Sequence, residues 1–425
     1  MLELLDLRQR GERLEPTSLE VDPTVEGTVR DILARVRAEG DGVLLELALK
    51  FDGADLGSTG LVVTPDEFAR AEAETPTELK AALDALVERL TDLHTRQLPR
   101  EWWDEREGVR FGEMVRPLRA VGCYVPGGRA VYPSSVCMTV VPAIVAGVEQ
   151  IVLCTPPRPD GSVSASVLYA AVRAGATNVI KSGGAQAIGA LTYGTASVPR
   201  VDRIVGPGNA YVTEAKRQVA GTVGVDGLAG PSEIVIVADA DADAELAAID
   251  LIAQAEHDPQ AKTHFVTTDP AIVYRVRDAL GRELVNAGRR EIVDQALAHA
   301  RAILVRDLDQ AAEVTDDIAA EHLLVLLPDP RAFLRNVRNA GAVFLGPWSA
   351  VPFGDYGIAS NHVLPTAGTA RFASGLRSAD FVTVRSVVQL APEGAAAFAG
   401  ETSTIARAEG LVGHARAMDV RKERA

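Results

Sequence analysis

The sequence predicts an α/β protein with two doubly wound, Rossmann-like parallel-sheet domains, a helical N-terminal extension and a small C-terminal extension. From residue 120 onward, short apolar runs alternate with Ala-rich stretches of helical length. Each run is bounded by Gly, Pro or Asp, and such runs are typical of parallel strands that are covered on both faces. Because the 425 residues contain nine runs, more than one comfortable sheet, we expect two sheets. The runs are AVGCYVP, QIVLC, NVIKSGG, RIVGPG, EIVIVAD, THFVTTD, AILVRD, LLVLLPD and GAVFLG.

The first hundred residues have a helical pattern. Apolar side chains recur every three or four residues in two stretches, which predicts two amphipathic helices. A short extended pair is expected over residues 109–115. The two apolar stripes comprise Val25, Val29, Ile32, Leu33 and Val36, and Leu79, Leu83, Leu86, Val87 and Leu90.

Composition excludes several classes of protein. The formal net charge of −15 and the pI near 5.0 argue against a nucleic-acid partner, because a phosphate backbone would be repelled. The charged N-terminal stretch does not resemble a signal peptide, and no apolar run is long enough to span a bilayer. Cys123, Cys137 and Cys154 lack the spacing of a disulfide framework or a zinc site, and the last two lie in apolar runs that predict burial. We therefore expect a cytoplasmic protein that binds neither nucleic acid nor membranes.

Glycine-rich loops follow three of the predicted strands. In open parallel sheets, ligands bind beyond the carboxyl ends of the strands, and glycine lets backbone amides approach an anion there. The third loop lacks the last glycine of the usual dinucleotide fingerprint, and tight turns more often use glycine for geometry alone. A cofactor loop and a plain turn therefore both remain possible. The loops are Tyr124-Val-Pro-Gly127-Gly128, Ser182-Gly183-Gly184-Ala-Gln186 and Gly206-Pro-Gly208-Asn209.

The seven histidines include candidates for a metal site. Two imidazoles, a carboxylate and an amide oxygen are a plausible ligand set for Zn²⁺, with Mn²⁺ less favoured. Spacing alone does not separate such a site from ordinary surface polarity. The candidates lie in three segments that are far apart in the chain: Gln254 and His257, Asp355 and His362, and Glu409 and His414.

An acid and an imidazole open one predicted strand. Glu321 and His322 precede Leu323, and neighbouring residues on a regular strand point to opposite faces. If both act on one substrate, the backbone is irregular or the substrate lies along the mouth of the strand. A solvated corner between a helix and a strand is the alternative. The remaining histidines, His94, His264 and His299, are predicted to be structural.

Taken together and in order, several long motifs resemble those of the histidinol dehydrogenase family. They extend from about Arg116 to His414, which is most of the chain. They are RPLRAVGCYVPGG, SGGAQAIGALTYGT, VDRIVGPGNAYVTEAKRQV, AGPSEI, QAEHDP, AAEHL, AGAVFLG, FGDYGIASNHVLPT and AEGLVGHA. The resemblance implies oxidation of L-histidinol to L-histidine through L-histidinal, with two NAD⁺ used in succession and one zinc ion per subunit, as the last step of histidine biosynthesis.

The resemblance also implies roles for individual residues. It makes Glu321 and His322 the acid–base pair. The implied zinc ligands are Gln254, His257, Asp355 and His414. The implied NAD contacts are Tyr124, Gln186 and Asn209. The implied substrate contacts are Ser232, Gln254, His257, His322, Asp355, His362, Glu409 and His414.

A homodimer is implied as well, in which Glu409 and His414 complete the partner's site. We accordingly expect a helical arm over residues 1–20 and a small helical dimerisation segment over 377–425. Between them, residues 21–122 and 232–376 are expected to form a first α/β domain with most of the metal and acid–base residues. Residues 123–231 are expected to form a second α/β domain that is associated with NAD.

One departure and three rivals qualify this interpretation. Ala359 stands where relatives usually have glycine, so the loop that carries His362 could be reshaped. A zinc hydrolase is a rival, although the glycine-rich loops and the lack of a His-Glu-x-x-His run disfavour it. The others are a relative that oxidises a different amino or sulfonated alcohol, and a metabolite sensor without activity.

Overall fold

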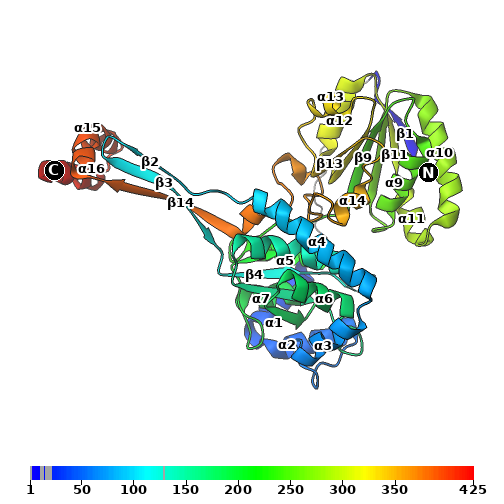
Figure 1. Ribbon diagram of the computed structural model, residues 1–425, viewed down its shortest axis with the longest axis horizontal. Coiled ribbons are helices and arrows are strands. Elements are labelled where there is room, and N and C mark those ends of the chain that lie inside the picture. Colours follow the sequence, from blue (N-terminus) through cyan, green and yellow to red (C-terminus); the bar gives the residue numbers. More distant parts are fainter. Residues whose placement is uncertain (1, 10–13, 15–21, 128–129) are drawn as a thin grey trace.

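The computed structural model describes residues 2–9, 14, 22–127 and 130–425. Figure 1 shows two rounded α/β bodies, each built around one parallel sheet, and an arm that reaches away from both. The predicted fold class is confirmed, and all nine predicted strands are present as β4 to β7 and β9 to β13. Along the described residues, no helix combines the length and the apolarity needed to cross a bilayer.

Sheet A has six parallel strands in the order β1-β11-β10-β9-β12-β13. Side chains alternate between its two faces, so one face packs on α9, α10 and α11 and the other on α12 and α13. The strands are β1 (Glu3–Asp6), β9 (Glu233–Ala238), β10 (Lys262–Thr267), β11 (Arg301–Leu304), β12 (His322–Leu326) and β13 (Ala342–Leu345). The helices are α9 (Ala244–Ala255), α10 (Pro270–Glu283), α11 (Arg290–Leu297), α12 (Leu308–Ile318) and α13 (Pro330–Leu334).

Sheet B has five parallel strands in the order β6-β5-β4-β7-β8. One face packs on α1, α2, α7 and α8, and the other packs on α4, α5 and α6, with α3 against α6. The strands are β4 (Ala120–Tyr124), β5 (Gln150–Thr155), β6 (Asn178–Lys181), β7 (Arg203–Val205) and β8 (Gly224–Val225). The helices are α1 (Pro23–Glu39), α2 (Asp41–Leu47), α3 (Pro65–Glu74), α4 (Thr77–Arg96), α5 (Pro133–Ala146), α6 (Ala165–Ala174), α7 (Gly184–Tyr193) and α8 (Ala210–Val219).

The arm is an antiparallel sheet that ends in two helices. The sheet has the order β14-β3-β2, and β14 pairs with β3 along its whole length. The helices α15 and α16 lie at the tip of the arm, where the chain ends (Figure 1). The elements are β2 (Trp102–Arg106), β3 (Val109–Pro117), β14 (Val382–Leu390), α15 (Pro392–Ala408) and α16 (Val412–Arg424).

The helical arm predicted over residues 1–20 is wrong where it can be tested. Glu3–Asp6 form β1, which pairs in parallel with β11 at the edge of sheet A. The side chains of an edge strand remain largely exposed, so this short segment carries charges and lacks the apolar run of a central strand. Residues 10–13 and 15–20 of the predicted arm lie outside the described residues.

Two further boundaries are corrected. The helices of residues 22–96 belong with sheet B and not with sheet A, because α1 packs on α7 and α8, and α4 packs on α5, while residues 102–106 and 109–117 are strands of the arm. An apolar stripe predicts that a helix is buried, but it does not say which sheet buries it. The segment 377–425 was expected to be helical, yet it contains the nine-residue strand β14. That strand is largely exposed and its apolar residues do not alternate regularly, so the pattern gave no strand signal.

Candidate active site

The amino edge of sheet A faces the carboxyl edge of sheet B. His362 follows α14 (Val351–Asp355), in the chain that leaves sheet A. Its Nε2 lies 3.0 Å from the Oγ of Ser135, which opens α5 just beyond the carboxyl end of β4. The chain 355–366 therefore lies between the two bodies, and most of the predicted site residues are near it.

Glu321 and His322 meet at the mouth of β12. The strand begins at His322, so Glu321 is outside the regular ladder and the two side chains need not point apart. The Nδ1 of His322 lies 3.6 Å from the Oε2 of Glu321, and the side chains are 5% and 8% exposed. The same Oε2 accepts a hydrogen bond of 3.1 Å from the backbone N–H of Glu233, and Ser232 donates its hydroxyl to Glu321. The alternative of a solvated corner is wrong.

Burial changes the protonation of this pair in opposite directions. Burial raises the pKa of Glu321 to about 8, and the nearby charge of Asp355 adds to that rise. Burial, together with the nearby His257, lowers the pKa of His322 to about 3. Neither ring nitrogen of His322 has a hydrogen-bond partner among the described residues. In the ligand-free protein near neutral pH, Glu321 is therefore protonated, and His322 is neutral with a lone pair available.

Three predicted metal ligands lie around His322. The Oδ1 of Asp355 is 3.8 Å from His322 Nε2, and burial raises the pKa of this carboxyl to about 6. Gln254 is buried in the last turn of α9, which brings the end of the helix to the amino edge of the sheet. His257 follows two residues after α9, and its charge acts on both His322 and His362, so it lies near both rings.

The chemistry of these donors suits zinc. An amide oxygen, an imidazole nitrogen and a carboxylate oxygen are all borderline or hard ligands that Zn²⁺ accepts. The Nε2 of Gln254 is buried and has no partner in the described part of the chain, but this NH₂ group is a hydrogen-bond donor, and only the amide oxygen could ligate zinc. However, no group of three or more His, Cys, Asp and Glu side chains is arranged to hold a metal within residues 2–9, 14, 22–127 and 130–425. Of the three donors named here, only His257 and Asp355 belong to these residue types.

His362 is fixed at both ring nitrogens. Its Nδ1 lies 2.8 Å from the backbone oxygen of Asp355, and because a carbonyl can only accept, Nδ1 carries the proton. Nε2 therefore accepts the hydroxyl proton of Ser135. Burial lowers the pKa of His362 to about 4, which keeps the ring neutral. Ala359 does not adopt a positive φ; the left-handed residue of this loop is Gly357, with φ of 74°. The loop thus takes its shape without glycine at position 359.

Glu409 and His414 lie elsewhere in the same chain. Glu409 ends α15 and His414 is in the first turn of α16, both exposed at the tip of the arm and away from the two α/β bodies (Figure 1). The structure of one chain therefore gathers seven predicted residues at one place and leaves these two apart. The gathered residues are Ser232, Gln254, His257, Glu321, His322, Asp355 and His362.

The described residues of the three glycine-rich loops all lie at the carboxyl edge of sheet B, and Gly128 of the first loop lies outside the described residues. The chain winds from β4 through β5 to β6 on one side and returns to β7 on the other, so β4 and β7 flank a topological switch point. The hydroxyl of Tyr124 accepts a hydrogen bond of 3.1 Å from the backbone N–H of Gly184, which ties two of the loops together. Gln186 is buried in the first turn of α7.

The third loop needs its glycine for close approach. Gly206 has φ of 113°, and a Cβ at this position would lie 2.0 Å from the backbone oxygen of Tyr124. Asn209 caps α8 by accepting hydrogen bonds from the backbone N–H groups of Tyr211 and Val212, at 3.1 and 3.2 Å. Its side-chain NH₂ remains for a ligand. Turn geometry and ligand binding are thus compatible explanations of these loops.

A buried ion pair that sequence reasoning missed holds this loop in place. Lys216 Nζ lies 2.6 Å from Asp226 Oδ1 and 2.5 Å from the backbone oxygen of Gly206. The other carboxylate oxygen of Asp226 accepts the N–H of Gly206 at 2.6 Å. The two charged side chains are 3% and 8% exposed. The sequence did contain a sign of this pair, because Lys216 occupies a position of α8 that the apolar pattern of the helix predicts to be buried.

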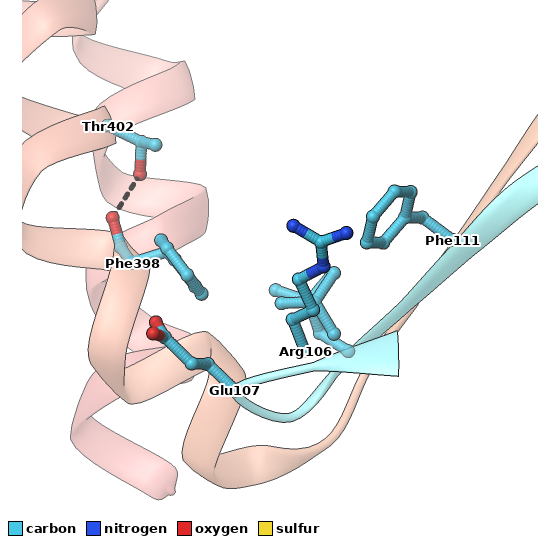
Figure 2. Close-up of a pocket in the computed structure, with 7 residues that line it drawn as sticks. Arg106, Glu107, Phe111, Phe398 and Thr402 are labelled. Carbon is cyan, nitrogen blue, oxygen red and sulfur yellow. Dashed lines mark hydrogen bonds between the residues drawn. The ribbon is translucent and has the colours of Figure 1, made fainter. Parts of the chain in front are cut away.

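A hollow of about 450 Å³ on the arm is a separate feature. Figure 2 shows the Arg106 guanidinium close to the Phe111 ring, with Phe398 of α15 on the opposite side. None of the predicted site residues lines it, and most of the lining side chains are apolar. It is therefore not a candidate for the active site. The lining residues are Arg106, Glu107, Val109, Phe111, Leu390, Phe398 and Thr402.

Comparisons with known proteins agree over nearly the whole chain. The sequence model of the family described as histidinol dehydrogenase matches residues 16–422. Histidinol dehydrogenase of Halalkalibacterium halodurans is 45% identical over 400 residues, which cover 94% of each chain. The protein of the same name from Moorella thermoacetica is 46% identical over 402 residues, covering 94% of this chain and 95% of that one. The crystal structure of histidinol dehydrogenase from Elizabethkingia anophelis superposes with a TM-score of 0.95 at 32% identity, covering 99% and 98% of the two chains.

Proposed function

Because the chain belongs to the histidinol dehydrogenase family, we propose that it oxidises L-histidinol to L-histidine through L-histidinal, by two successive hydride transfers to NAD⁺ in the last step of histidine biosynthesis. One observation carries the proposal beyond the family name. A buried carboxyl and a buried neutral imidazole lie 3.6 Å apart, next to a buried amide and a second carboxyl that suit a metal. Such oppositely shifted neighbours are typical of catalytic sites.

His322 is the proposed base in both oxidation steps. Its ring is neutral and its nitrogens are unpaired within the described residues, so it can accept the proton of the substrate hydroxyl as the hydride departs. In the second step it would accept the proton of the hydrated aldehyde. Each general-base role is typically worth about 10²–10⁴ in rate.

Glu321 is the proposed activator of the water that attacks the aldehyde. In that role it must be ionised, whereas burial keeps it protonated in the ligand-free protein. The hydrogen bonds from Glu233 N–H and the Ser232 hydroxyl already favour its charged form. Ser232 would in addition contact the substrate.

Gln254, His257 and Asp355, with His414 of the partner subunit, would hold the zinc ion. When bound, zinc would supply positive charge that orients the amine and imidazole nitrogens of histidinol and lowers the pKa of neighbouring carboxyls. The position of Asp355 and His257 close to His322, with Gln254 in the last turn of the helix that precedes His257, supports this assignment.

We propose a homodimer in which each arm reaches the partner. This would bring Glu409 and His414 to the other subunit's amino edge of sheet A, where both would contact the substrate. The extension of the arm away from its own site supports the exchange (Figure 1). The exposed apolar side chains on the arm, such as Trp103, Val388 and Val412, would be covered in a dimer.

Tyr124, Gln186 and Asn209 would line the NAD site at the switch point of sheet B. The facing edges of the two sheets support this, because a nucleotide on one edge is close to a substrate on the other. His362 lies at that junction, and since both of its ring nitrogens are engaged, it would contact histidinol through its ring. A cytoplasmic location remains a prediction.

A direct experiment separates this function from its rivals. Purified protein is mixed with histidinol and NAD⁺, and the absorbance of NADH is followed to completion. The proposal expects two NADH per histidinol, loss of activity with a chelator, and recovery with zinc. A metabolite sensor would bind histidinol without forming NADH, and a hydrolase would act on esters or amides without NAD⁺. A relative with another substrate would prefer a different amino or sulfonated alcohol from a panel. Any of these results would contradict the proposal.

A further inference from the structure

His94 lies in the last turn of α4 and belongs to a hydrogen-bond chain that reaches the candidate site. The residue is fully buried, at 0% exposure. Its Nδ1 is 2.8 Å from the Oε1 of Gln97, and its Nε2 is 3.2 Å from the Nδ2 of Asn361. Asn361 immediately precedes His362 and comes from the other side of the junction between the two bodies. The sequence had suggested no more than a structural histidine at this position.

Backbone groups determine the position of every proton in this chain of hydrogen bonds. Asn361 Nδ2 lies 2.7 Å from the backbone oxygen of Met138, and Asn361 Oδ1 lies 2.9 Å from the backbone N–H of Val363. A carbonyl only accepts and an amide N–H only donates, so the side-chain amide has one possible orientation. Its NH₂ therefore faces His94, whose Nε2 must carry a lone pair. The proton of His94 is then on Nδ1 and is donated to Gln97.

This chain constrains the backbone on both sides of His362. Asn361 is 6% exposed, so its amide has no water with which to replace a lost partner. We propose that His94 is a positioning residue for His362. By accepting a hydrogen bond from the Asn361 amide, His94 fixes the turn 361–363. The turn then orients the His362 ring, so that its Nδ1 donates to the backbone oxygen of Asp355 and its Nε2 faces Ser135. The kinetic part of the inference rests on the proposed function, in which His362 contacts histidinol.

The alternative is that His94 only fills space in the core between α4 and α5. Leucine has a similar volume and would then serve as well, apart from some loss of stability. The positioning role requires an acceptor at this place, which leucine cannot supply and glutamine can. The pair His94→Leu and His94→Gln therefore separates the two roles.

The experiment uses the full-length protein labelled with ¹⁵N-histidine. The His362 signals are assigned with His362→Gln, and their ¹⁵N shifts report which ring nitrogen carries the proton. KM for histidinol, KM for NAD⁺ and kcat are measured on the same samples. Thr95→Ala is the matched control, because Thr95 is exposed on the same helix and its hydroxyl bonds only within that helix in the described structure.

We expect wild-type His362 to be neutral with the proton on Nδ1. His94→Leu should mix the two tautomers and raise KM for histidinol about ten-fold, as the loss of one buried hydrogen bond predicts, with KM for NAD⁺ unchanged. His94→Gln should restore both readouts to near wild type, and Thr95→Ala should change neither. In a His362→Gln background, His94→Leu should have no further effect on KM.

A second variant applies if His94→Leu does not fold. Gln97→Leu removes the acceptor that keeps the His94 proton on Nδ1. If the proton moves to Nε2, two donors, this N–H and the Asn361 NH₂, face each other, and the same His362 signals should be disturbed. An unchanged His362 tautomer in the folded variants would overturn the inference. So would a rise in KM caused by His94→Leu that is equally large in the wild-type and His362→Gln backgrounds. If wild-type protein does not oxidise histidinol, the proposed function fails, and the ¹⁵N signals still decide the role of His94.

Discussion

The Nδ1 of His322 and the Oε2 of Glu321 lie 3.6 Å apart, and burial moves the pKa values of the two groups in opposite directions. The separation is too long for a direct hydrogen bond, so neither group neutralises the other. The ring nitrogens of His322 have no hydrogen-bond partner among the described residues, so the ring is free to bind a substrate hydroxyl. A base and a protonated acid are thus placed side by side before any ligand arrives, which is a common way to prepare proton transfer.

Glu321→Gln should impair oxidation of histidinal more than oxidation of histidinol to histidinal. Glutamine keeps the shape and the hydrogen bond from Glu233 N–H, but it cannot take a proton from water. We expect the aldehyde step to slow by about 10²–10⁴. Each step is measured with its own starting substrate, and equal losses in both would count against the assigned role.

His257→Asn should lose metal together with activity. The variant removes one of the two proposed imidazole ligands and leaves the fold intact, because His257 lies beyond the end of α9. Zinc content by elemental analysis should fall well below one per subunit after dialysis. His299→Asn, which changes an exposed histidine after α11, is the control and should keep its zinc. Full zinc content in His257→Asn would exclude this residue as a ligand.

Lys216→Met should destabilise the protein and weaken NAD⁺ binding. It leaves Asp226 buried without its cation, which typically costs about 3–5 kcal/mol. It also frees the backbone oxygen of Gly206 in the third glycine-rich loop. Arg96→Met is the control, because the Arg96–Asp92 pair lies on the surface, and we expect a change of less than about 1 kcal/mol. Urea unfolding and NAD⁺ titration check both effects; similar stability of the two variants would contradict the account of the loop.

His264 should make the protein less stable in acid. Burial, together with the nearby charges of Arg301 and Lys262, lowers the pKa of His264 to about 4. The unfolded chain binds this proton near its ordinary pKa of about 6.5. The stability contribution of the neutral ring is therefore present above about pH 6.5 and is lost as pH falls through about 4.

His264→Gln should remove that pH dependence. We expect the loss of unfolding free energy between about pH 7.5 and pH 4.5 to be about 1–2 kcal/mol smaller in the variant than in the wild type. Urea unfolding at the two pH values measures the difference. Parallel pH profiles for the two proteins would show that His264 does not stay neutral in the fold.

The sequence predicts the central strands well and the edges poorly. Fully covered strands such as β9 and β12 are continuous apolar runs, so their positions are visible. The positions of the edge strand β1 and of the largely exposed strand β14 are not visible, because solvent tolerates any side chain on an exposed face. The assignment of the helices of residues 22–96 to the wrong sheet has another cause: the sequence indicates that α1 and α4 are buried but not which surface covers them.

The site divides in the same way. The spacing of Gln254 and His257 predicts that they share one side of a helix end. Their approach to Asp355 and Glu321 depends on how separate segments of the chain fold together, and only the resemblance to family motifs indicated that approach. The cap formed by Asn209 could have been predicted, since Asn directly before a helix is a common N-cap. The role of His94 could not, because its partner Asn361 is far away in the sequence and lies in a loop without regular structure.

The most direct test of the account is a heterodimer of two inactive variants, Glu321→Gln and His414→Ala, each with its own affinity tag. If each site takes Glu321 from one subunit and His414 from the other, each homodimer is inactive, while the purified heterodimer has one intact site and regains about half of the wild-type activity. A heterodimer as inactive as its parents would show that the site is built within one chain, contrary to the arrangement proposed here.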